Sequence, residues 1–123
     1  DLTIVSWGMT LVLSVEVAQE LSTLGISVEV IDLRTIVPCD FATVLESVKK
    51  TGKLLVTHEA SEFCGFGSEL VATMAEQAYL YLDAPIRRVC GLHAPVPYSK
   101  ILENEVLPQK EKLLQAAKAL ADF

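Results

Sequence analysis

Short apolar runs alternate with longer amphipathic stretches along the whole chain. Four runs are rich in β-branched residues and have the length of strands; they cover residues 2–7, 26–33, 53–57 and 86–90. Stretches with apolar residues at helical spacing follow each run, beginning near residues 10, 40, 68 and 108. This strict alternation predicts one α/β domain over residues 1–123, with three α/β/α layers around a mainly parallel sheet of about four strands.

Polar residues and glycines indicate where these helices begin and end. Thr10 and Asp40 have side chains that can cap the first and second helices. Gly25 and Gly52 stand where a helix ends in left-handed backbone. The residues expected on the inward faces are Leu11, Val15, Ala18 and Leu21 in the first helix, Phe41, Val44, Leu45 and Val48 in the second, Leu70, Val71, Met74, Ala75 and Ala78 in the third, and Leu113, Ala117, Leu120 and Ala121 in the last.

The second strand and the turn after it form the stretch around which the other elements are arranged. Residues 28–33 are mostly apolar and β-branched, so we expect a strand buried on both faces. Asp32 and Arg34 close this strand, and in parallel sheets ligands and partners meet the carboxyl ends of strands. The two side chains either pair with each other and fix the loop, or contribute to an interface.

Composition and charge restrict the possible partners. Although 51% of the residues are hydrophobic, no apolar run approaches the roughly 18 residues of a membrane span, and we expect no membrane contact. The net charge is −6, and no lysine or arginine precedes Arg34. Such an acidic chain is unsuited to nucleic acid, whereas a basic patch on another protein fits it.

Three cysteines and two histidines are the residues that suggest a metal site. Cys39, Cys64 and Cys90 are an odd number, which favours reduced thiols over a disulfide framework. Together with His58 and His93 they show no structural-zinc spacing, and the pair Cys90 and His93 stands alone. We therefore expect thiols packed in the structure, and neither a metal nor a nucleophilic triad.

The segment 58–68 is the other candidate for chemistry. His58 and Glu59 could act as an acid–base pair, but neighbours in an extended strand point to opposite faces. We expect one of them to be structural and the other to line an interface. Gly65, Phe66 and Gly67 precede a helix whose start could cradle an anion. They lack the third glycine and the lysine of phosphate loops, and close packing against a neighbouring subunit explains two glycines as well.

Several segments, taken in order, carry a resemblance to a known family. They are Val28–Thr35, Pro38 with Asp40, Ser47–Gly52, His58–Ala60, Gly65–Gly67 and Ala84–Val89. Together they resemble the C-terminal domain of the beta subunit of the thiamine-diphosphate-dependent, decarboxylating component of 2-oxo acid dehydrogenase complexes. This group includes the pyruvate and branched-chain 2-oxo acid enzymes, and transketolase is a more distant relative. The resemblance runs from Thr3 to the C-terminus and owes its specificity to this length.

The resemblance implies an assembly role rather than catalysis. In the family, thiamine diphosphate and magnesium lie in the preceding half of the beta subunit and in the alpha subunit, so we expect no cofactor and no catalytic residue in this chain. The parent enzyme would oxidatively decarboxylate a 2-oxo acid onto lipoyl groups, in the bacterial cytoplasm or the mitochondrial matrix. The family's additional antiparallel edge strand would precede Asp1, so we expect a sheet without it. The residues expected to contact the alpha subunit and a second beta subunit are Asp32, Arg34, Glu59, Gly65, Phe66, Gly67 and Arg87.

A second implied role is docking of the dihydrolipoyl acyltransferase core. In family members that bind the core through the beta subunit, an acidic residue before an Ala-Pro pair and the C-terminal carboxylate receive basic groups of the acyltransferase's subunit-binding domain. Asp83 and Phe123 stand at those positions, and the acidic charge of the chain agrees with this role. Asp83 is also explained as a turn residue at a helix end. Two alternatives stay open: the same domain of a transketolase-like enzyme, or a self-contained flavodoxin-like domain that binds an anion or nucleotide at residues 65–68.

Overall fold

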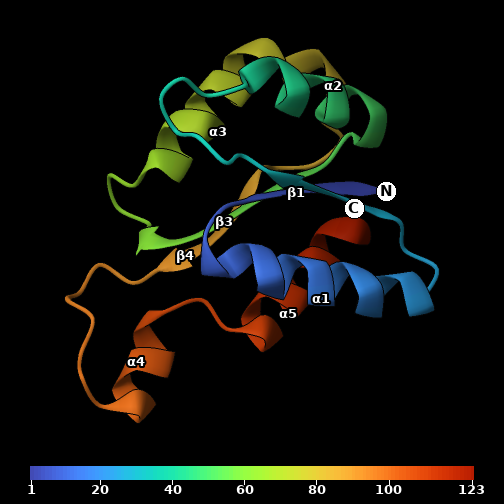
Figure 1. The fold of residues 1–123 in the computed structure, drawn as a ribbon. Coiled ribbons are helices and arrows are strands. Elements are labelled where there is room, and N and C mark those ends of the chain that lie inside the picture. Colours follow the sequence, from blue (N-terminus) through green and yellow to red (C-terminus); the bar gives the residue numbers. More distant parts are fainter.

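The computed structural model describes residues 1–123 and confirms the α/β architecture (Figure 1). Its elements are β1 (Leu2–Ser6), α1 (Met9–Thr23), β2 (Val28–Asp32), α2 (Phe41–Thr51), β3 (Leu54–Ser61), α3 (Phe66–Gln77), a 3₁₀ turn (Tyr79–Tyr81), β4 (Arg87–Gly91), α4 (Lys100–Val106) and α5 (Lys110–Ala121). The strands form one parallel sheet in the order β2-β1-β3-β4. Helices α2 and α3 cover one face and α1 and α5 the other, so the sheet is the middle of three layers.

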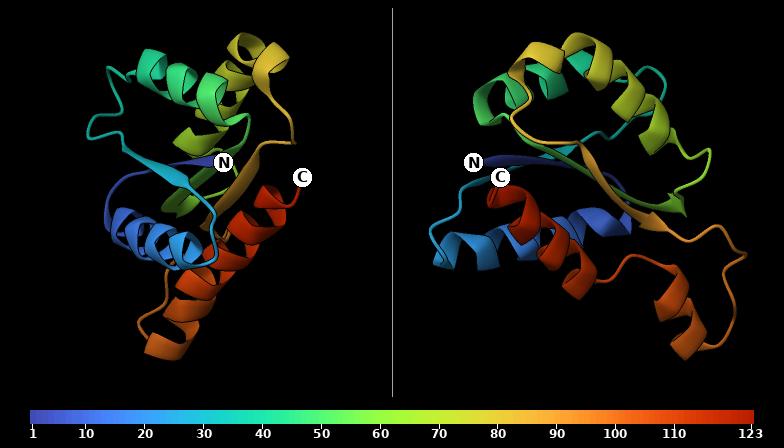
Figure 2. Two further views of the ribbon diagram at one scale, coloured as in Figure 1. Left: turned by 90° about the vertical axis from the view of Figure 1, so that its right-hand side faces the viewer. Right: turned by 180° about the vertical axis from the view of Figure 1, so that it is seen from behind.

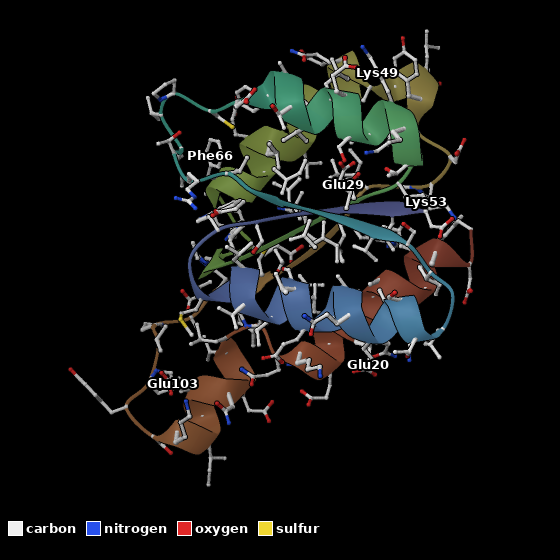
Figure 3. All side chains as sticks on the ribbon, turned by 45° about the vertical axis from the view of Figure 1, so that its right-hand side comes forward. Glu20, Glu29, Lys49, Lys53, Phe66 and Glu103 are labelled. Carbon is white, nitrogen blue, oxygen red and sulfur yellow. The ribbon has the colours of Figure 1, made fainter.

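All strands run in the same direction, so the sheet has two chemically different ends. The strands begin at Leu2, Val28, Leu54 and Arg87, which we call the amino end of the sheet. They finish at Ser6, Asp32, Ser61 and Gly91, which we call the carboxyl end. Figure 3 shows Lys53 and Phe66 at these opposite ends. The chain termini lie near each other in both views of Figure 2.

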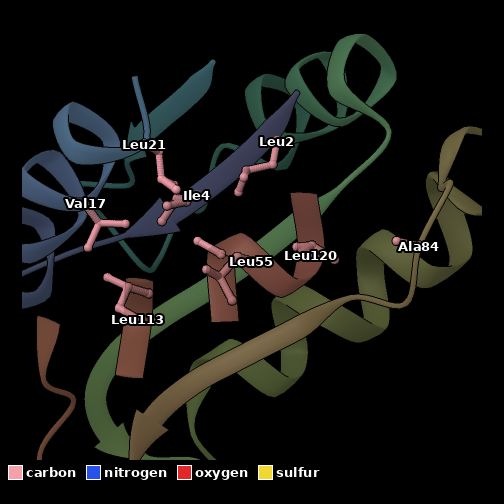
Figure 4. Close-up of a cluster of buried hydrophobic side chains, with 9 residues drawn as sticks. Leu2, Ile4, Val17, Leu21, Leu55, Ala84, Leu113 and Leu120 are labelled. Atoms are coloured by element: carbon pink, nitrogen blue, oxygen red, sulfur yellow. The ribbon is translucent and has the colours of Figure 1, made fainter. Parts of the chain in front are cut away.

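Successive strand residues alternate between two separate cores. Leu2 and Ile4 of β1 pack with Leu55 against α1 and α5, as Figure 4 shows. Val5 and Val56 belong to the cluster under α2 and α3. Burying each such aliphatic side chain contributes roughly 1.5–3 kcal/mol, so both layers are needed to hold the sheet.

Helix α1 buries hydroxyl groups that its hydrophobic pattern did not predict. Its buried residues are Thr10, Ser14, Val17 and Leu21. The prediction that Val15 faces inward is wrong, because Val15 is 42% exposed. Thr10 does not cap the helix but lies inside it, where its Oγ1 donates to the Trp7 carbonyl at 2.9 Å and accepts from Ser6 Oγ at 2.9 Å. These bonds satisfy the hydroxyls, which allows polar groups in the core.

Strand β2 is an edge strand rather than a strand buried on both faces. Every residue of β2 is of intermediate burial, because only β1 lies beside it. The predictions for the following helix are confirmed. Asp40 accepts a hydrogen bond from the Thr43 amide at 3.0 Å, and Gly52 ends α2 with a φ of 71°.

Two segments in the second half of the chain differ from the predicted elements. Helix α3 begins at Phe66, two residues before the expected Ser68, and Ala75 on it is exposed rather than buried. A further helix, α4, lies between β4 and α5 and extends away from the body of the domain (Figure 1). It buries no residue, so it has no inward apolar face from which it could be predicted.

No helix of the structure is both long enough and apolar enough to cross a membrane.

Candidate functional site at the two ends of the sheet

His58 is buried at the carboxyl end of the sheet and is 1% exposed. The Trp7 ring stacks on its imidazole with 4.8 Å between centroids, and Cys90 Sγ lies 3.3 Å from its Nε2. Burial lowers the pKa of His58 and raises the pKa of the Cys90 thiol to about 11. Both groups are therefore neutral near pH 7, and the partly buried Cys90 packs against the buried His58 ring.

Gly65 and Gly67 leave room for this buried ring. A Cβ atom on Gly67 would collide with His58 Nε2, and a Cβ atom on Gly65 would lie 2.8 Å from His58 Cε1. Phe66 stands between the two glycines and contacts the edge of Trp7, with 5.8 Å between ring centroids. The close packing that explains these glycines is thus within the chain itself, against the His58 ring at Gly67 and against both the Ser61 carbonyl and the His58 ring at Gly65.

The start of α3 does not fit a phosphate group. Ser68 Oγ already accepts a hydrogen bond from Arg88 at 2.6 Å and donates one to the Glu62 carbonyl at 3.2 Å. Arg88 also pairs with the Glu62 carboxylate at 3.2 Å, and Glu69 lies in the first turn of the helix. The Ser68 hydroxyl and the Arg88 guanidinium are thus already paired, and Glu69 brings negative charge to the start of the helix, so the anion- or nucleotide-binding alternative gains no support here.

Asp32 and Arg34 pair with each other at the end of β2. Arg34 Nε donates to Asp32 Oδ2 at 2.9 Å, and the Arg34 amide donates to Asp32 Oδ1 at 3.2 Å. The structure therefore shows the first of the two alternatives, in which Asp32 and Arg34 pair with each other.

Glu59 is exposed whereas His58 is buried, so these neighbours do not form an acid–base pair.

The contacts that sequence reasoning missed join residues far apart in the chain. His58 and Cys90 are 32 residues apart, and so are Ser61 and His93, whose Oγ and Nδ1 atoms lie 3.2 Å apart. The first pair depends on the register of β3 and β4, in which His58 is directly opposite Cys90, and strand alternation alone gives the face of each residue but not this register.

Asp83 lies at the amino end of the sheet, where it is exposed and held by Gly52. The Asp83 amide donates to the Gly52 carbonyl at 2.8 Å, and its carboxylate occupies the space that a Cβ atom on Gly52 would need. The adjacent Lys53 donates from Nζ to the Ala121 carbonyl at 2.7 Å. Two consecutive residues therefore bring Asp83 and the end of α5 to the same end of the sheet, and Phe123 beyond it is 64% exposed.

The candidate residues thus fall into two groups. Those at the carboxyl end are Asp32, Arg34, Glu59, Gly65, Phe66 and Gly67, and those at the amino end are Asp83, Arg87 and Phe123. All three cysteines are free. Cys39 and Cys90 are partly buried, but Cys64 is exposed, so the prediction that the thiols are packed is wrong for Cys64. No group of three or more His, Cys, Asp or Glu side chains is placed to hold a metal.

Comparison with known proteins gives sequence and structural relatives. Residues 1–113 match the family model described as transketolase, C-terminal domain. The chain is 42% identical to 2-oxoisovalerate dehydrogenase subunit beta 2, mitochondrial, of Arabidopsis thaliana, over 100% of this chain and 34% of that protein. It is 43% identical to pyruvate dehydrogenase E1 component subunit beta of Rhizobium meliloti, over 98% of this chain and 26% of that protein. Among solved structures, a split gene transketolase described as an inactive beta4 tetramer superposes on this chain with a TM-score of 0.83. The match covers 99% of this chain and 38% of that one. Its sequence identity is 23%, so this likeness shows the fold alone.

Proposed function

The chain belongs to the transketolase C-terminal domain family, and from this premise we propose that it is the C-terminal assembly domain of the beta subunit of a thiamine-diphosphate-dependent 2-oxo acid dehydrogenase. The observation that carries this proposal is the identity of 42–43% with two such beta subunits over essentially the whole chain. The chain spans 34% and 26% of those proteins, so the activity would belong to a longer protein of which this domain is a part.

The parent enzyme would oxidatively decarboxylate pyruvate or a branched-chain 2-oxo acid and transfer the acyl group to lipoyl groups. Relatives named for each of the two substrates are about equally similar to this chain, so both are retained. The setting would be the bacterial cytoplasm or the mitochondrial matrix.

Thiamine diphosphate would supply the decarboxylation chemistry in the parent enzyme, together with magnesium. The side chains at the start of α3 do not fit the diphosphate, because the His58 ring fills the space beside the two glycines and Arg88 holds Ser68. We therefore assign the cofactor to the preceding half of the beta subunit and to the alpha subunit, and no reaction step to this chain.

The carboxyl end of the sheet is the part we assign to contacts with the alpha subunit and a second beta subunit. Asp32, Arg34 and Glu59 supply charged groups there. Phe63, which follows β3, is 65% exposed and Met9, which follows β1, is 64% exposed at the same end of the sheet, which suits an interface that mixes apolar and charged groups. Arg87 lies at the other end of the sheet, so we do not group it with these contacts.

The amino end is the part we assign to docking of the acyltransferase core. Asp83 offers an exposed carboxylate, and Gly52 and Lys53 hold it on the same side of the domain as the end of α5. An arginine or lysine of the subunit-binding domain would form charge-assisted hydrogen bonds with such a carboxylate. In a protein that ends at Phe123, the terminal carboxylate of this residue would be a second acceptor for the basic groups of the subunit-binding domain.

Calorimetric titration of the chain with the acyltransferase's subunit-binding domain tests this assignment. Asp83→Asn is expected to weaken binding about tenfold, since it removes the charge but keeps the shape of the side chain. Asp32→Asn at the opposite end is the matched control and should leave the affinity unchanged. Adding one residue after Phe123 tests the terminal carboxylate separately. Equal affinities for Asp83→Asn and the unmodified chain would remove Asp83 from the docking site.

A further inference from the structure

Strand β4 is an open edge of the sheet. It pairs only with β3, from Leu55 opposite Arg87 to His58 opposite Cys90, and no further strand lies beyond it (Figure 2). Its other side therefore presents unpaired backbone groups to any segment that approaches. Side chains of β4 alternate, so Ile86, just before the strand, and Arg88 belong to the α3 face, whereas Arg87 and Val89 belong to the α5 face.

On the α3 face, an apolar groove lies beside the start of β4. Its volume is about 410 Å³, and six of its seven lining residues are hydrophobic. Val71 and Ala75 of α3 form one wall, and Leu82 and Ile86 form the other. Tyr79 lies at its rim and is 74% exposed. An apolar side chain would lose its contact with water on entering this groove.

On the α5 face, a second groove lies beside the same end of β4 and has the opposite chemistry. Its volume is about 330 Å³, and its polar lining consists of Arg87, Lys112 and Gln115. All three side chains can donate hydrogen bonds, and no acidic residue lines the groove. Neither Arg87 nor Lys112 takes part in an ion pair, although the chain carries a net charge of −6.

We infer that the free edge of β4 binds an extended peptide segment in which apolar and acidic residues alternate. Successive residues of a strand point to opposite faces, so one such segment would place apolar side chains in the α3-face groove and carboxylates beside Arg87 and Lys112. Backbone hydrogen bonds to β4 would supply the rest of the contact.

The charges on β4 argue against a second copy of this chain as the occupant. Two β4 strands paired across a two-fold axis would bring Arg87 and Arg88 of both copies together, and like charges on paired strands are unfavourable. Arg88 is already held by Glu62 and Ser68, so Arg87 is the arginine left for a partner. The inference does not depend on the identity of the parent enzyme.

The test uses a short, end-blocked and fluorescently labelled peptide of alternating valine and glutamate. Fluorescence anisotropy with the whole chain is expected to show saturable binding. A peptide with lysine in place of glutamate should bind at least about tenfold more weakly, because it meets Arg87 and Lys112 with like charge. A peptide N-methylated at alternate residues, which cannot complete the strand ladder, should also lose affinity.

Variants of the chain separate the two grooves from a general charge effect. Arg87→Glu and Ala75→Gln are each expected to reduce the affinity about tenfold, the first by reversing a charge and the second by filling the apolar groove. Both positions are exposed, and circular dichroism checks that the variants fold. Arg34→Glu changes the net charge equally but lies at the other end of the sheet, so it should leave the affinity unchanged.

Three results would overturn the inference. The first is an absence of saturable binding, and the second is an equal loss with Arg34→Glu and Arg87→Glu. The third is a dimer in sedimentation experiments that Arg87→Glu dissociates, which would assign this edge to a second copy of the chain.

Discussion

The two ends of the sheet both carry conspicuous polar residues, but the fold uses them in opposite ways. At the carboxyl end, His58 is 1% exposed, stacks on Trp7 and fills the space left by Gly67. At the amino end, Asp83 is exposed, and only its backbone and the space over Gly52 fix its position. Burial therefore separates a histidine that stabilises the domain from a carboxylate that remains available to a partner.

Among variants at the two ends of the sheet, Gly67→Val is expected to cause the largest loss of stability. The added side chain collides with the His58 ring at the packed end of the sheet, and overpacking of this kind costs typically about 1–3 kcal/mol of unfolding free energy. Urea unfolding measures it. Ala72→Val, at an exposed position of the same helix, controls for the helix propensity of valine. Equal stability of the two variants would show that the carboxyl end is not tightly packed around His58.

The second expected effect is a loss of stability that appears only in acid solution. Burial holds the pKa of His58 below its ordinary value of 6.5, so the unfolded chain binds more protons than the folded one as the pH falls below 6.5. Stability is therefore full above this pH and declines as the pH falls toward the folded pKa. The charged groups facing the ring are Arg88, which opposes protonation, and Glu62, which favours it.

Urea titrations between pH 7 and pH 5 measure this decline with His58→Gln and His93→Gln. The first substitution should flatten the dependence on pH because it removes the buried ionisable group. The second removes an exposed histidine and should leave the dependence close to that of the unmodified chain. A steep decline that survives in His58→Gln would contradict the buried, neutral state of His58.

Lys53→Met tests how firmly the amino end is held together. It removes the hydrogen bond from Nζ to the Ala121 carbonyl, which is expected to cost about 1 kcal/mol of unfolding free energy. Lys112→Met removes an exposed lysine of α5 that forms no ion pair, and it should change the stability less. If both variants are equally stable, the bond from Lys53 does not anchor α5.

Asp32→Asn should have the smallest effect on the isolated chain. The ion pair with Arg34 joins side chains that are 29% and 83% exposed, and exposed pairs contribute about 0–1 kcal/mol. Thermal unfolding at low and high salt measures this contribution. A much larger loss of stability would mean that the loop after β2 depends on this pair for its structure.

The layers of the fold were predictable from the sequence, because hydrophobic periodicity reports which face of an element is buried. It correctly placed Val44 and Val48 on the inner face of α2, and Asp40 at its start. Periodicity says little about neighbours within the sheet, so β2 was expected to be buried on both faces although it is an edge strand of intermediate burial. Helix α4 escaped prediction because no residue in it is buried.

The candidate site was predictable only in part, for a related reason. A side chain's position along a strand follows from the sequence, so the separation of His58 from Glu59 was expected. Its partners across the sheet do not follow, and the stacking of Trp7 and the contact with Cys90 therefore appeared only in the structure. The same holds for the bond from Lys53 to Ala121, whose residues are 68 positions apart.

Hydrogen exchange of the chain with and without the acyltransferase's subunit-binding domain tests the contrast between the two ends most directly. We predict slower exchange on binding at residues 52–53, 82–84 and 120–123, and no change across residues 58–67. Protection confined to residues 58–67 would contradict the account, because it would place the docking partner on the end that we assign to internal packing and subunit contacts.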